Sequence, residues 1–303
     1  MKLFVILNNC FIMNRIKINF SFFLLFSVFI VNSIKSQDTL HYIFLGHIQR
    51  YLPTAGTVVD LRIEGIDYST FDRVWLGGDI AIETSLRYKI LEYVDSLFDV
   101  SNPSNAWAFG NHDLRSFNEE WLYQITGRKT YYTHFENGIT TIVLNLAIAP
   151  DDCEKLNEQF EMIENVVDTI SESSHLILLS HQNVWKDVPG LPSPGTYCHS
   201  NQKSWIANCY DQSASYINAI YPLLLQVKDK GINVINILGD AGAQSKGKSM
   251  VSDDGIFYIA SGIDARTEEE VGPDKVLILD HIPETSELNW QFHNLDSLFL
   301  TFQ

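Results

Sequence analysis

The stretch Ala106-Trp-Ala-Phe-Gly-Asn-His-Asp113 decides the fold class. It begins as a short apolar run of strand length. At Gly110 it changes abruptly into Asn111, His112 and Asp113, which can bind a metal ion or a proton. Glycine lets the backbone turn sharply and lets a ligand come close. The stretch therefore predicts a strand that ends at a functional site.

The same pattern recurs at four other apolar runs. These runs end at Gly46-His47-Ile48-Gln49, Gly77-Gly78-Asp79, Ser180-His181-Gln182-Asn183 and Gly239-Asp240-Ala241-Gly242. The carboxyl ends of strands in an open α/β sheet line one crevice, so these residues are expected to converge. Carboxylates, imidazoles and an amide oxygen on one rim predict a site for a divalent cation. Singly, each residue is more often a turn residue, a cap or a structural histidine, so the prediction rests on all five positions together.

The remaining histidines lack this placement, and we predict structural roles for His41, His134, His175, His199, His281 and His293.

The rhythm of the chain is that of an α/β domain, in which apolar strands alternate with helices. Eight runs of strand length cover 41–45, 73–76, 106–109, 139–146, 175–179, 232–238, 256–259 and 276–279, and helical spacing covers 86–98, 153–170 and 213–230. There is no internal repeat and no low-complexity linker. We therefore expect one domain over 37–303.

The amino-acid composition limits the location and the classes of function that the protein can have. The 303 residues include 21 Lys and Arg against 37 Asp and Glu, and 46% are hydrophobic. Residues 1–36 hold four basic side chains, no acidic one and an apolar run of about 14 residues, which predicts a signal peptide. That run is shorter than the roughly 20 residues that span a bilayer. We therefore expect an exported protein, periplasmic or extracellular, with no stable membrane span after cleavage.

Removal of this segment leaves 17 basic against 37 acidic residues, a net charge of −20. Such acidity argues against nucleic-acid binding. The cysteines that then remain are Cys153, Cys198 and Cys209. Outside the cytoplasm Cys198 and Cys209 could close a small loop and leave Cys153 odd, but a sequence does not determine the pairing.

The sequence resembles the calcineurin-like metallophosphoesterases. The match is most specific at Gly110-Asn111-His112-Asp113, with Gly78-Asp79 before it and His181 after it, and it extends from about His41 to Leu279. The resemblance implies an α/β fold that is a four-layer α/β/β/α sandwich of two mixed β-sheets flanked by helices. It also implies two metal ions at the strand ends and hydrolysis of phosphate mono- or diesters by metal-activated water.

Individual roles follow from the resemblance. It implies that Asp79 bridges both metal ions and that Asn111 and His181 bind the second one. It implies catalytic roles for His112, which protonates the leaving oxygen, and for Asp113, which orients His112.

Two motifs depart from the family. The family begins with Asp-x-His, and here either His47 and Gln49 take these two positions, or His47 is the histidine and Leu45 takes the aspartate position. The family's late Gly-His-x-His motif has Asp240 at its first histidine and Gly242 at its second. Most of the missing metal ligands belong to the first of the two metal ions.

We call the two sets of ligands the first and the second cation positions. The first retains His47, Gln49 and Asp79, whereas the second retains four competent ligands: Asp79, Asn111, His181 and Asp240. We therefore expect one firmly bound divalent ion (Mn, Fe, Zn or Ca) in the second position and a weak or absent ion in the first.

The leading hypothesis is an exported phosphoesterase for small-molecule or lipid/glycan phosphate esters. Because the protein is acidic, its substrate would be attracted by the ion and by Arg115, Lys186 or Lys203. The alternative is a catalytically silent relative that binds a glycan, a lipid headgroup or a protein partner in the same crevice. It draws on the long irregular stretch 183–210, where aromatic residues either stack on a ligand or anchor the loop: Tyr197, Trp205 and Tyr210.

Overall fold

The structure is a computed structural model that describes residues 38–52, 56–81, 87–114, 118–193, 207–211, 213–240, 246–264 and 272–301. The chain divides into two units, Met1–Asp38 and Thr39–Gln303. The predicted signal peptide at 1–36 lies outside the described residues, so export stays a prediction. None of the described helices is both long enough and apolar enough to cross a membrane.

The second unit contains two mixed β-sheets and a hairpin. One sheet has the strand order β13-β12-β1-β4-β5, the other has the order β10-β11-β9-β8-β7-β6, and β2 pairs with β3. The first sheet is parallel from β1 to β5 and antiparallel at β12 and β13, while β6 and β10 run antiparallel at the edges of the second. The strands are β1 Leu40–Leu45, β2 Gln49–Leu52, β3 Gly56–Val59, β4 Arg73–Leu76, β5 Ala106–Trp107, β6 Tyr132–Glu136, β7 Ile139–Val143, β8 His175–Ser180, β9 Asn233–Leu238, β10 Lys248–Val251, β11 Phe257–Ala260, β12 Lys275–Ile282 and β13 Glu287–Asn294.

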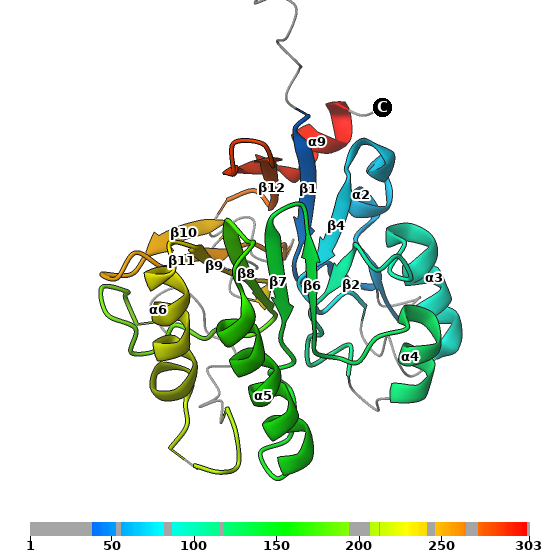
Figure 1. The fold of residues 1–303 in the computed structure, drawn as a ribbon. Coiled ribbons are helices and arrows are strands. Elements are labelled where there is room, and N and C mark those ends of the chain that lie inside the picture. Colours follow the sequence, from blue (N-terminus) through cyan, green and yellow to red (C-terminus); the bar gives the residue numbers. More distant parts are fainter. Residues whose placement is uncertain are drawn as a thin grey trace, which may run out of the picture. The chain divides into compact units, whose positions relative to one another are not determined.

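Helices cover the outer face of each sheet. Against the six-stranded sheet pack α5 (Cys153–Thr169) and α6 (Tyr221–Asp229), which follows the π-helical turn η5 (Tyr216–Ile220). Apolar side chains of the other helices pack with the five-stranded sheet: α2 (Leu61–Glu64), α3 (Tyr88–Phe98), α4 (Glu119–Thr126) and α9 (Leu295–Thr301), together with the 3-10 turn η2 (Tyr68–Thr70). Figure 1 shows α5 and α6 on one side of the sheets and α3 and α4 on the other.

A third apolar core fills the space between the two sheets. It includes Phe44 and Trp75 from one sheet and Ile177, Leu179 and Ile259 from the other, all at most 3% exposed. The arrangement is helices, sheet, sheet, helices. The predicted four-layer α/β/β/α sandwich is therefore confirmed.

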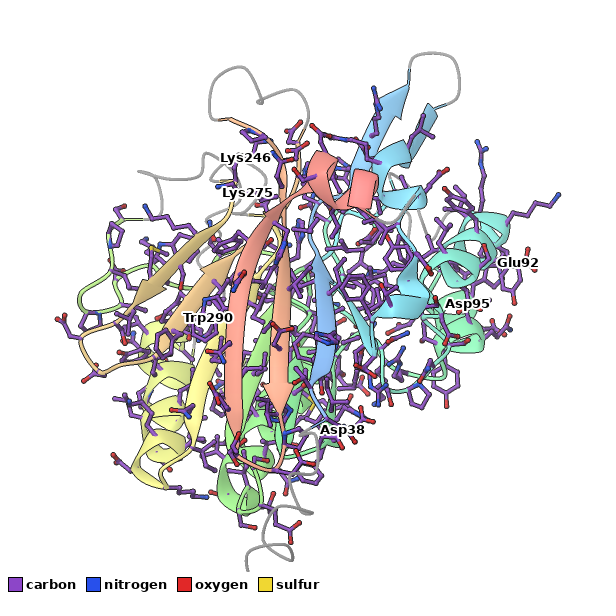
Figure 2. All side chains as sticks on the ribbon, turned by 90° about the horizontal axis from the view of Figure 1, so that it is seen from above. Asp38, Glu92, Asp95, Lys246, Lys275 and Trp290 are labelled. Atoms are coloured by element: carbon purple, nitrogen blue, oxygen red, sulfur yellow. A yellow bond between two sulfur atoms is a disulfide. The ribbon has the colours of Figure 1, made fainter. Side chains whose placement is uncertain are left out.

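All eight predicted strands and the three predicted helices are present, with ends shifted by a few residues. The strands that the sequence did not reveal lie at sheet edges or in the hairpin: β2, β3, β6, β10 and β13. One of them, Glu287–Asn294, carries Trp290 and lies beside β12 in Figure 2. Edge strands are half exposed and alternate apolar with polar residues, so a search for continuous apolar runs passes over them.

One disulfide corrects the suggested cysteine pairing. Cys209 pairs with Cys153, the first residue of α5, and Cys198 lies outside the described residues. The Cys209 backbone N–H also donates to Asn157 Oδ1 at 2.8 Å, and Tyr210 Oη donates to Glu161 Oε1 at 3.0 Å. Tyr210 thus anchors the end of the long stretch to α5, whereas Tyr197 and Trp205 lie outside the described residues.

Candidate metal centre

The candidate site lies where the carboxyl ends of strands from both sheets approach each other. Here the backbones are in contact: a Cβ added to Gly239 would lie 1.9 Å from the carbonyl oxygen of Gly77. No side chain fits in that gap, which explains Gly239, and a Cβ added to Gly77 would lie 2.3 Å from the Phe44 ring and 3.0 Å from Gly239 Cα. The close approach brings the turns that follow β1, β4, β8 and β9 within reach of one another.

His47 follows β1 in the left-handed conformation, with φ 50°. Its backbone N–H donates to Gly78 O at 2.9 Å. Its ring Nδ1 lies 3.0 Å from Ile263 O, and because a carbonyl only accepts, Nδ1 carries the proton. That tautomer leaves the lone pair on Nε2, which lies 3.9 Å from Asp79 Oδ2. Asp79 is thus within reach of His47.

Gln49 shares this environment. Its backbone N–H donates to Asp79 O at 3.0 Å, and its side-chain Nε2 lies 3.5 Å from Asp79 Oδ2 and 3.4 Å from His47 Nε2. Leu45, by contrast, is fully buried in an apolar core. This placement favours the alternative in which His47 and Gln49 both take the positions of the first motif.

Asp79 lies at the middle of the site and is 2% exposed. Its Oδ1 accepts from the backbone N–H of His112 at 2.9 Å, and its Oδ2 lies 3.3 Å from His181 Nε2. Burial alone would raise the pKa of this carboxyl group. The positive charge and hydrogen bond of His181 outweigh burial, with smaller contributions from the neighbouring His47 and from the backbone N–H of His112, so the pKa of Asp79 is well below its usual range.

His181 is completely buried between the sheets. Its Nδ1 donates to Gly77 O at 2.7 Å, so Nε2 points toward Asp79 and toward Asp240 Oδ1, which is 4.0 Å away. Burial favours the neutral imidazole, but the Asp79 carboxylate outweighs it and raises the pKa of His181 to about 10. His181 and Asp79 form a buried ion pair, although Nε2 makes no well-oriented hydrogen bond with the described residues.

Asp240 completes this side of the site. It follows β9, is 4% exposed and donates its backbone N–H to His181 O at 2.9 Å. Asn111 and His112 are partly buried in the turn after β5. Ligand and proton-donor roles for their side chains remain predictions, and Gly242 lies outside the described residues.

Asp113 has a function that the sequence did not reveal. Its carboxylate accepts from three backbone N–H groups at 2.8–2.9 Å: Asp79, Ile80 and Gly110. Burial, followed by the charge of Asp79, raises the pKa of Asp113 to about 6. These bonds fasten the turn after β4 to the turn after β5. The predicted orientation of the His112 side chain by Asp113 stays a prediction.

The donor atoms are spaced nearly as the ligands of a divalent cation are. No group of three or more His, Cys, Asp or Glu side chains in the described part of the chain is already arranged as a metal site. Two ligands about 2.1 Å from one ion lie about 3.0–3.4 Å apart. The distance of 3.3 Å between Asp79 Oδ2 and His181 Nε2 matches this. The distance from His47 Nε2 to Asp79 Oδ2, 3.9 Å, and that from His181 Nε2 to Asp240 Oδ1, 4.0 Å, are about half an ångström longer.

Two buried polar atoms in the site also lack hydrogen-bond partners among the described residues, His181 Nε2 and Gln49 Oε1. Both are metal-ligating atom types. The residues therefore fit a cation after small side-chain movements.

The chain matches no protein-family model and no curated protein. Three solved structures are similar to it at 10–12% sequence identity. A dimetal phosphatase from Danio rerio has a TM-score of 0.47 at 10% identity, covering 80% of this chain and 95% of that one. GAP50, the anchor in the inner membrane complex of Plasmodium, has 0.48 at 10%, covering 88% and 95%. Phosphopantetheinyl hydrolase from Mycobacterium tuberculosis has 0.47 at 12%, covering 77% and 93%.

Proposed function

We propose that the chain is an exported, metal-dependent phosphoesterase that hydrolyses a small-molecule or lipid/glycan phosphate mono- or diester. One observation carries the proposal. Asp79 Oδ2 lies between the Nε2 atoms of His181 and His47, at 3.3 and 3.9 Å, and both rings are oriented by backbone carbonyls. A carboxylate between two oriented imidazoles is a donor set for a divalent cation.

The second cation position would use the ligands Asp79, Asn111, His181 and Asp240, and the first would use Asp79, His47 and Gln49. A divalent cation bound there would neutralise phosphate charge and lower the pKa of a water molecule. The carboxylates of Asp79 and Asp240 in the second position balance one 2+ charge. Hence we assign the firm ion to the second position and a weaker one to the first.

His112 is assigned as the general acid that protonates the leaving oxygen. Its backbone N–H is bonded to Asp79 Oδ1, and the turn that carries it is fixed by Asp113. The backbone from which the acid projects is therefore held next to the ligand set. Positioning of this kind is what general acid catalysis requires.

Export is supported by two features. Residues 1–36 have the composition of a signal peptide. The disulfide between Cys153 and Cys209 is typical of proteins in oxidising compartments.

The test compares wild-type protein with His112→Ala on nitrophenyl monoester and diester substrates in the presence of Mn²⁺, Zn²⁺, Fe²⁺ or Ca²⁺. Loss of a general acid is expected to lower kcat about 10²–10⁴-fold while metal content stays the same. His293→Ala, on β13, is the matched control and should keep wild-type activity. Absence of hydrolysis with every metal, or equal rates in wild type and His112→Ala, would contradict the proposal.

A second candidate function is a catalytically silent protein that binds a glycan, a lipid headgroup or a protein partner in the same crevice. The observation in its favour is that Asp79 and His181 already compensate each other's charge as a buried pair. Metal analysis after purification in metal-replete medium separates the two functions. Protein that stays essentially metal-free supports the silent relative.

A further inference from the structure

A buried ionic cluster lies outside the ligand set. It joins residues at the start of α2, after β11, before β10 and before β12. Lys246 Nζ contacts Asp274 Oδ1 and donates to Asp264 O at 2.6 Å. Arg62 Nη2 donates to Asp274 Oδ2 at 2.6 Å, and the same guanidinium contacts both oxygens of Asp60 at 3.0 and 3.2 Å. We call these five residues the Lys246 clamp.

The buried charges of the clamp contribute little net stability for the free energy that their desolvation costs. Lys246 is 2% exposed and Asp274 is fully buried. Transfer of such charges out of water costs several kcal/mol per ion, and well-packed apolar residues often stabilise a fold as well or better. Lys246 also has a positive φ of 51°, which is unfavourable for a side chain of this size. Figure 2 marks Lys246 and Lys275, the first residue of β12.

The clamp fixes the backbone on both sides of His47. Asp264 donates its backbone N–H to Asp274 Oδ1 at 2.9 Å, which holds the preceding residue, Ile263, in place. Ile263 in turn donates its N–H to Gly46 O at 3.0 Å. On the other side, Asp60 donates its backbone N–H to Ile48 O at 2.9 Å.

The clamp also determines how the imidazole of His47 is oriented. Ile263 O accepts the proton of His47 Nδ1 at 3.0 Å, so its position selects the tautomer that leaves Nε2 facing Asp79. His181 has a separate orienting carbonyl, Gly77 O. The clamp therefore acts on one of the two cation positions.

We infer that the Lys246 clamp is the positioning device of the first cation position: it holds Ile263 O so that His47 presents Nε2 toward Asp79. The inference rests on the proposed function only where it concerns metal. The tautomer of His47 does not depend on bound metal and can be measured in the metal-free protein. Outer partners that orient a metal-binding histidine typically change metal affinity 10–100-fold when they are removed.

The first measurement is the His47 tautomer by long-range ¹H–¹⁵N NMR of the full, metal-free protein, with the His47 signals assigned from His47→Gln. Wild type is expected to show one tautomer, protonated at Nδ1. Lys246→Met and Asp274→Asn are expected to show a mixture of tautomers, and Lys246→Arg, which keeps the charge, should restore the single form. Lys230→Met is the matched control, because Lys230 Nζ donates to Val167 O at 2.5 Å, outside the clamp and the ligand set.

The second measurement is calorimetric titration with Mn²⁺. Lys246→Met is expected to weaken the weaker of two binding events 10–100-fold and to change the tighter one less than threefold. If Lys246→Met does not fold, Arg62→Met is used, because the Arg62 side chain is already 20% exposed.

An unchanged Nδ1-protonated His47 in the folded clamp variants would overturn the inference. Wild-type protein that binds no Mn²⁺ would instead count against the proposed function, and the tautomer comparison would still decide the inference.

Discussion

The two ends of strand β8 carry histidines that are equally buried and yet differ in pKa. His181 follows the strand at the candidate site, and His175 begins it at the opposite end. They are 0% and 4% exposed. The pKa of His181 is raised to about 10, whereas the pKa of His175 is lowered to about 4.

The difference comes from what faces each ring. Around His181 lie the carboxylates of Asp79 and Asp240 at 3.3 and 4.0 Å. His175 is lowered first by burial and then by His281, whose ring centre lies 6.1 Å away across the space between the sheets. Burial alone thus disfavours a positive charge on His175, whereas the carboxylates beside His181 stabilise one there. That contrast identifies the end where a cation can bind.

The strongest test of this contrast is Asp79→Asn, which removes the carboxylate that both proposed cation positions would share. Metal content is expected to fall to under about a tenth of wild type, since the shared ligand loses its charge. The metal-free protein should also lose about 3 kcal/mol of unfolding free energy, because a buried ion pair is broken. Metal analysis and urea unfolding measure the two effects.

Asp280→Asn is the control for Asp79→Asn, because it breaks the exposed pair of His41 and Asp280, and should cost less than about 1 kcal/mol. If both variants changed metal content and unfolding free energy equally, the carboxylate at the candidate site would have no particular role.

His175, at the start of β8, should make the stability of the fold sensitive to acid. The folded pKa of His175 is about 4, below the ordinary 6.5, so the unfolded chain binds the proton more tightly. The stability that neutral His175 contributes is complete above pH 6.5 and is lost as pH falls from 6.5 toward 4. His281, with its pKa lowered by burial, adds to the effect, and the charge of Glu284 opposes it. The ring centre of Tyr42 lies 6.5 Å from that of His281.

His175→Gln tests this sensitivity. Between pH 7.5 and 4.5 wild type is expected to lose about 2 kcal/mol more unfolding free energy than the variant. Urea unfolding at the two pH values measures the difference. Identical losses in both proteins would show that His175 is not the group responsible.

Local residue order predicted the alternation of strands and helices and the five strand ends that carry the candidate site residues, whereas the four layers were implied by the family resemblance. Continuous apolar runs identify strands buried on two faces, and a polar residue after such a run identifies a strand end. It did not predict which cysteines pair, because Cys153 and Cys209 are 56 residues apart in the sequence and are neighbours only in the folded chain.

It also missed the groups that orient the site. Ile263 O and Gly77 O are backbone atoms, and every residue has one, so no residue type signals their role. The contact between Lys246 and Asp274 joins residues 28 positions apart across two loops. Asp113 was recognised as part of the motif, but its bonds to three backbone N–H groups depend on how the turns after β4 and β5 meet.

The smallest expected effect comes from Gln49→His, which adds an imidazole to the first cation position. The backbone N–H of Gln49 is bonded to Asp79 O, so a new side chain begins at the same place and faces the same carboxylate. Imidazole is a better ligand than an amide for transition metals. The weaker Mn²⁺ binding event is therefore expected to tighten about tenfold, equivalent to about 1.4 kcal/mol, while the tighter event and the acid sensitivity stay unchanged. Gln291→His, on the exposed face of β13, is the control, and a weak event unchanged by Gln49→His would show that Gln49 does not belong to the first position.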